Sequence, residues 1–119
     1  MDKRANSICS FRLLYDNINS IFLSYGGDID EDWNGAYNCA LNMNWRDGRK
    51  IIFHICDANA HGSLFGTNTK HENENNKLIE TIKIVAKRNI EVFGLNIVGG
   101  ATKSFTNFHN YYKDYLGKS

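Results

Sequence analysis

The chain lacks proline altogether, has no apolar run long enough to cross a bilayer, and has no excess of charge of either sign. Its 14 Lys and Arg residues and 13 Asp and Glu residues leave a net charge of +1. The basic residues are scattered, which excludes the positive patch of a nucleic-acid-binding protein and the basic face of a membrane-surface protein. Residues 1–10 are polar and do not resemble a secretory signal, so we expect a cytoplasmic protein.

Cysteine is scarce as well. The chain has three cysteines, Cys9, Cys39 and Cys56, and none of them forms a CxxC motif. Because their number is odd, they cannot all pair within the chain, which excludes a disulfide framework. Cys39 falls on the apolar side of a predicted helix, and Cys56 lies in a predicted buried strand. We therefore expect both to be reduced thiols of the core.

The length of 119 residues and the 42% hydrophobic content predict one globular domain. Residues 1–16 are predicted to be a poorly ordered segment or a short helix or strand, and residues 17–119 the domain itself. Residues 11–25 carry apolar side chains at helical spacing, namely Phe11, Leu14, Ile18, Ile21, Phe22 and Tyr25. A short strand over residues 8–14 is the competing interpretation.

The rest of the pattern alternates between helices and strands. Helices are predicted at about 31–44, at 77–88 and from 102 to about 116, and strands at 50–57 and 91–98. The strand KIIFHICD is apolar almost throughout, as in a parallel strand covered on both faces. A long polar loop, 58–76, is interpreted as either a binding loop or a mobile one. This order predicts an α/β fold with a parallel sheet.

Two carboxylates are placed for a joint role. Asp57 ends the strand 50–57, and Asp28 lies at the start of the helix before it. Sites in open α/β sheets lie beyond the carboxyl ends of the strands, so both side chains are expected at one crevice. Two carboxylates can hold Mg²⁺ weakly. The alternative is that Asp28 and its acidic neighbours only stabilise a helix N-terminus.

Other motifs fail on their spacing. An EF-hand starting at Asp28 would need glycine at Trp33 and glutamate at Cys39. His54, Cys56 and His61 lack the fourth ligand that structural zinc requires. No nucleotide-binding glycine loop is present, and Gly99 is followed by Gly100 rather than by lysine.

A series of motifs runs along the chain. It consists of Gly26-Gly27-Asp28-Ile29-Asp30-Glu31-Asp32, Met43-Asn44-Trp45 and Ile51–Gly62, followed by Ala86–Ile90 and Ala101-Thr102-Lys103. From Asn17 onward this series resembles a von Willebrand factor A-type domain of the kind found in amoebal alpha-type protein kinases. The resemblance implies a three-layer, Rossmann-like parallel α/β fold. Asp30 and Asn59 replace the two prolines of the family motif. The D-x-S-x-S of the family's first strand is absent, so the chain resembles a truncated domain lacking the first strands.

The resemblance also implies a function. In the family, metal-site positions match Asp28 and Asp57, so a weak Mg²⁺ site is the implied cofactor site. The implied interaction crest comprises Gly26, Gly27, Asp30, Asn59, His61 and Thr102. We expect a non-catalytic module that binds a protein partner. Because the family's neighbouring strand is missing, the open edge of strand 50–57 is a further site for self-association.

Two alternatives remain open at this point. In the first alternative, the chain is a fragment or accessory region derived from an alpha-type serine/threonine kinase. In the second, it is a decayed gene product. The first would explain the resemblance without activity, because the sequence contains no catalytic lysine motif and no nucleotide-binding loop.

Overall fold

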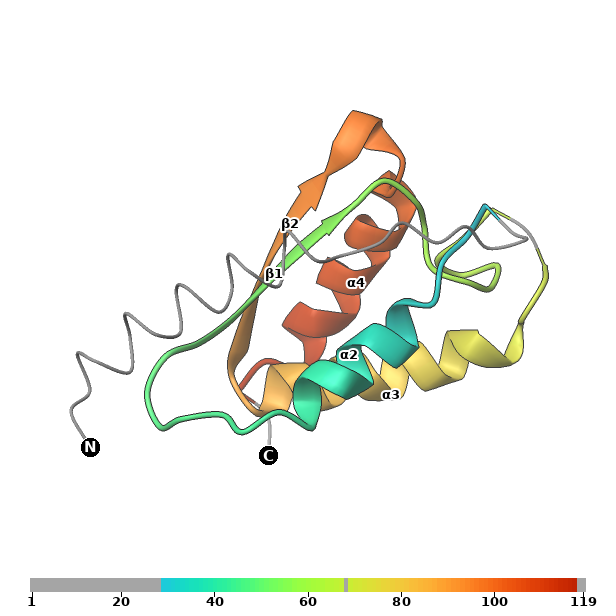
Figure 1. Ribbon diagram of the computed structural model, residues 1–119. Helices are drawn as coiled ribbons and strands as arrows, with labels where there is room; N and C mark the ends of the chain where they lie inside the picture. Colours follow the sequence, from blue (N-terminus) through green and yellow to red (C-terminus); the bar gives the residue numbers. More distant parts are fainter. Residues whose placement is uncertain (1–28, 68, 118–119) are drawn as a thin grey trace.

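The computed structural model describes residues 29–67 and 69–117 (Figure 1). Its elements follow the order α2 (Trp33–Leu41), β1 (Lys50–Cys56), α3 (Asn73–Lys87), β2 (Ile90–Asn96), the 3₁₀ turn η1 (Ile97–Gly99) and α4 (Thr102–Tyr115). Predictions for Gly26, Gly27, Asp28 and the segments 1–16 and 11–25 lie outside the described residues. The described part is a small α/β domain, which confirms the predicted class.

β1 and β2 form a parallel pair. Lys50 lies opposite Ile90 and Cys56 opposite Asn96, without an offset, and α3 makes the connection between the strands. The predicted parallel pairing is therefore confirmed. Within the described residues these two strands make up the whole sheet.

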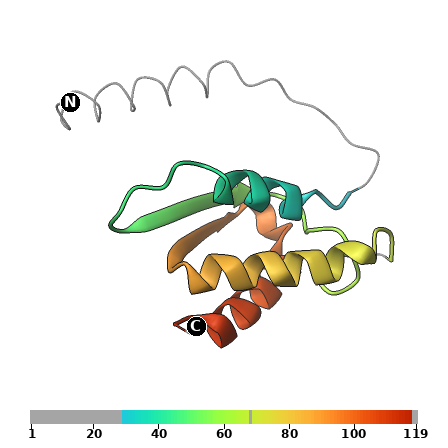
Figure 2. The same ribbon diagram turned by 90° about the horizontal axis from the view of Figure 1, so that it is seen from below.

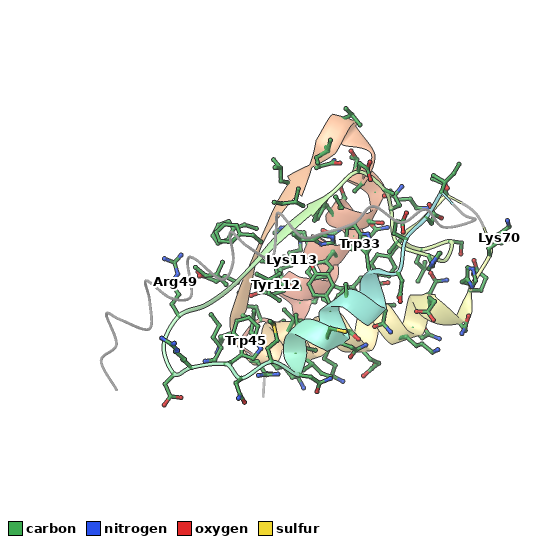
Figure 3. The ribbon with its side chains drawn as sticks, viewed as in Figure 1. Trp33, Trp45, Arg49, Lys70, Tyr112 and Lys113 are labelled. Carbon is green, nitrogen blue, oxygen red and sulfur yellow. The ribbon has the colours of Figure 1, made fainter. Side chains whose placement is uncertain are left out.

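The core lies between one face of the sheet and the three helices. Trp33 of α2, labelled in Figure 3, is central to the core. Its ring lies 4.2 Å from the His54 ring of β1 and 4.9 Å from the Phe105 ring of α4. The apolar stripe of α3 closes the core with Leu78, Ile82, Val85 and Ala86. In Figure 1, α2, α3 and α4 lie to one side of the two strands, and Figure 2 shows α3 between α2 and α4.

The prediction that strand 50–57 is covered on both faces is wrong for the described part of the chain. Alternate residues of a strand point to opposite faces, and Phe53 and Ile55 are 73% and 62% exposed. The described residues thus form two layers, one of helices and one of sheet. The predicted third layer, on the other face, stays a prediction.

The start of α3 corrects a second expectation. The stretch 72–76, predicted to belong to a solvated loop, contains the first turn of this helix, which begins at Asn73. The Asn75 side chain is buried, and its Oδ1 accepts a hydrogen bond from the Leu64 backbone N–H at 3.1 Å. The helix is extended because this contact and Glu72, which binds Ser63, hold its first turn to the preceding loop.

α2 is shorter than predicted, and its rotation exposes Cys39. Asp32 caps the helix by accepting a hydrogen bond from the Gly35 N–H at 2.9 Å, and the helix ends at Leu41. Only Trp33 and Tyr37 of this helix are buried. Cys39 is therefore exposed and Cys56 only partly buried, so the prediction of two core thiols is wrong for Cys39.

Candidate functional site

The candidate site is the crest, the surface beyond the carboxyl ends of β1 and β2, built from residues 29–32, 57–67 and 97–102. Hydrogen bonds join residues 29–32, which lead into α2, to the loop after β1. Glu31 donates its N–H to the Asn59 carbonyl at 2.8 Å and accepts the N–H of His61 at 3.1 Å. The Trp33 indole adds a hydrogen bond to the Ala58 carbonyl at 3.2 Å. The loop is thus attached along its first four residues.

Asp30 is a structural residue of this crest. Its side chain is 2% exposed, and its two carboxylate oxygens accept hydrogen bonds from the N–H and the hydroxyl of Thr67, at 3.0 and 3.1 Å. A Cβ at Gly66 would collide with this carboxylate and with the Ala60 carbonyl, so the turn requires glycine there. Both carboxylate oxygens of Asp30 thus have partners within the fold, and its contact with another protein stays a prediction.

Asn59 and Ser104 form a second buried junction. The Asn59 Oδ1 accepts the N–H of Ser104 at 3.0 Å. The Ser104 hydroxyl accepts the Ala60 N–H at 2.8 Å and donates to the Phe65 carbonyl at 2.5 Å. Both side chains are buried. Asn59 therefore joins the loop to α4, and its role as an interaction residue stays a prediction.

The first turns of α4 hold the far half of the loop. The Lys103 ammonium donates to the carbonyls of Ser63 and Gly66, at 2.6 and 2.7 Å, and the Asn107 amide donates to the Leu64 carbonyl at 2.5 Å. The interpretation of this loop as mobile is not supported over residues 58–67. The sequence did not lead us to assign a role to the side chains of Lys103 and Asn107. Their spacing, which places both on one face of α4, was the signal that could have indicated a shared contact.

The accessible part of the crest is smaller than predicted. Asp57 and Thr102 are exposed, and His61 is partly buried with its ring 4.5 Å from that of His71. The Thr102 hydroxyl donates to the Gly99 carbonyl at 3.0 Å. Val98 is 93% exposed and has φ 49° and ψ 22°, a left-handed conformation that is strained for a β-branched residue. Asp57, His61, Val98 and Thr102 are thus the side chains that this crest offers.

The described residues do not form a metal site. No group of three or more His, Cys, Asp or Glu side chains within residues 29–67 and 69–117 is arranged to hold an ion. Asp57 belongs to no such group, and Asp28 lies outside the described residues. The crest as described does not fit a tightly bound Mg²⁺, which needs close to octahedral oxygen ligands.

His54 belongs to the core and not to a zinc site. Its Nδ1 lies 2.7 Å from the hydroxyl of Tyr37. Burial lowers the pKa of His54 to about 4, so the ring is neutral at pH 7. Burial also raises the pKa of Tyr37 above its ordinary value, so its hydroxyl stays protonated.

Each strand borders an apolar groove. A groove of about 220 Å³ lies between β1 and α2, where Ala36, Tyr37 and Ala40 face residues 52–55. A larger groove, of about 480 Å³, lies between β2 and α4. Its lining includes Val92, Gly94, Phe105, Phe108 and Tyr112.

In comparisons with protein-family models, curated proteins and solved structures, the chain matches none of them. Among the described helices, none is long and apolar enough to cross a membrane. The function is therefore inferred from the residues and surfaces described above.

Proposed function

We propose that this chain is a non-catalytic protein-interaction module of the von Willebrand A type, which binds an extended segment of another protein along the open edge of β1. The observation that carries the proposal is the character of that edge. β1 is apolar along almost its whole length, yet within the described residues only β2 pairs with it.

An unpaired strand edge presents a row of N–H and C=O groups that pair with an added strand. In addition, a two-stranded sheet is marginal by itself, so a third strand stabilises it. The groove beside β1 supplies the side-chain contacts. Ala36 and Ala40 of α2 have short side chains, which leaves room for every second residue of an added strand to enter the groove.

The crest extends this surface beyond the end of the strand. Asp57 follows β1 directly and is exposed, and His61 and Thr102 lie on the neighbouring crest segments. In this proposal they contact the bound segment where it leaves the sheet. A carboxylate at Asp57 binds Mg²⁺ weakly at best, so the interaction does not depend on a metal.

The same edge can serve a second copy of the chain, and this defines a usable probe. A labelled peptide with the sequence of residues 49–57, with Cys56→Ser, carries the strand that a second copy would present. We expect it to bind the full chain in a fluorescence-anisotropy titration, whereas a peptide of scrambled sequence does not bind.

Two variants on α2 locate the binding. Ala36→Lys places a long charged side chain into the β1 groove and should weaken peptide binding at least about tenfold, the size of one lost buried contact. Asn38→Lys introduces the same charge on an exposed position of the same helix that does not line the groove, and should leave binding unchanged. Equal affinities for the two variants, or equal binding of the scrambled peptide, would contradict edge binding.

A further inference from the structure

The face of the sheet opposite the helices is apolar and uncovered in the described structure. Its side chains belong to alternate positions of the two strands. Phe53 and Ile55 of β1 face the same way as Phe93 and Leu95 of β2, which are 48% and 58% exposed. The rings of Phe53 and Phe93 stack with centroids 5.6 Å apart. The four side chains thus form one continuous patch, hereafter the open face.

Such a face is unusual for parallel strands. Parallel sheets are almost always covered on both faces, because their strands are apolar on both. A phenylalanine has roughly 150–250 Å² of surface, of which Phe53 and Phe93 expose 73% and 48%. With Ile55 and Leu95, the open face amounts to a few hundred Å², the size of patches that are often functional. α2, α3 and α4 all pack on the other face, where Trp33 of α2 and Phe105 of α4 both contact the His54 ring.

We infer that the open face is the docking surface for the N-terminal segment of the chain itself, residues 11–25. This segment precedes the described residues, and its sequence carries an apolar stripe at helical spacing: Phe11, Leu14, Ile18, Ile21, Phe22 and Tyr25. A helix with such a stripe needs an apolar surface to cover. The open face shares Phe53 and Ile55 with the groove beside β1 that the proposed function uses, but Phe93 and Leu95 of the open face do not line that groove.

The length and the attachment point of the segment fit this docking. As a helix, residues 11–25 extend about 22 Å, and the two seven-residue strands extend about 23 Å. The described chain begins at Ile29, and Glu31 forms a bridge with Ala60 just beyond the carboxyl end of β1. The described chain thus begins close to the carboxyl end of β1, and residues 26–28 are all that separate it in sequence from the segment. A tether this short gives a millimolar effective concentration, which favours the segment over a second copy.

The test uses the full chain and a pair of charge substitutions in the segment. Ile18→Asp places a charge within the stripe, and Ser20→Asp places the same charge on the opposite side of the predicted helix. Emission of the dye ANS, which binds exposed apolar surface, should rise severalfold for Ile18→Asp and stay at the wild-type level for Ser20→Asp. Equal emission from the two variants would overturn the inference.

A double-mutant cycle tests the contact itself. Leu95→Lys alters the open face at a position that does not line the β1 groove. Combined with Ile18→Asp, it should give an unfolding equilibrium constant about fivefold or more below the value expected from the separate effects. Combined with Ser20→Asp, it should be additive. Additivity in both pairs would overturn the docking.

Hydrogen exchange gives a readout that does not require the Ile18→Asp variant to fold. In Leu95→Lys, amides of residues 11–25 should exchange about tenfold faster or more, while those of α3 keep their rates. If instead residues 8–14 lose protection in Ala36→Lys and not in Leu95→Lys, the segment is a strand at the β1 edge, and the inference is wrong. A dimer that Leu95→Lys dissociates, seen by sedimentation across a wide concentration range, would assign the open face to a second copy and overturn it as well.

Discussion

Replacing Ser104 by alanine should destabilise the domain far more than the loss of one surface hydroxyl. The Ser104 side chain is fully buried, and its hydroxyl serves two backbone groups of the crest loop, the N–H of Ala60 and the carbonyl of Phe65. Removing the hydroxyl leaves both groups without a partner in a space too small for easy rearrangement. An unsatisfied buried polar group costs about 1–3 kcal/mol, so we expect a loss of about 2–4 kcal/mol in the free energy of unfolding.

The measurement is urea unfolding of the full chain, with the slope compared between variants to verify two-state behaviour. Ser63→Ala is the matched control, because it removes a hydroxyl of the same loop that donates to the exposed Glu72 carboxylate. The control should lose no more than about 0.5 kcal/mol. A loss below about 1 kcal/mol for Ser104→Ala would refute the view that this hydroxyl holds the crest together.

Three further predictions concern pH, backbone strain and metal. Because burial lowers the pKa of His54 to about 4, stability should be full above the unfolded-state pKa near 6.5, fall as the pH drops from about 6.5 to 4, and level off below. The side chain is only partly buried, so the loss in the free energy of unfolding should be about 1–2 kcal/mol, measured by urea unfolding at each pH. His54→Gln should remove this pH dependence, and an equally steep loss in that variant would contradict its assignment to His54. Val98→Gly should stabilise the chain by about 0.5–1 kcal/mol in thermal or urea unfolding, because it relieves a left-handed φ at an exposed position, whereas a net destabilisation would show that the strain is absent. Calorimetric titration with Mg²⁺ should give a Kd no tighter than about 10⁻³ M, and a micromolar Kd that is lost in Asp57→Asn would contradict the expectation of a weak site.

The sequence by itself determined the order of the described elements. The periods of 3.6 and 2 residues depend on local spacing, so helices around Trp33 and Leu78 and the apolar strand 50–57 followed from the pattern alone. The parallel pairing followed too, because a helix between two apolar strands favours a crossover connection. Helix ends were less accurate, since α2 ended at Leu41 and α3 began at Asn73.

The tertiary structure alone decided what the crest residues do. Asp30 and Asn59 looked like interaction residues in the sequence, but their partners, Thr67 and Ser104, lie 37 and 45 positions further along the chain. Local spacing contains no information about such contacts, because they form only when the loop and α4 are brought together. The exposure of Cys39 had the same origin, since the rotation of α2 is set by what packs beneath it. The open face beside Phe93 likewise became visible only once all three described helices were found on the opposite side of the sheet.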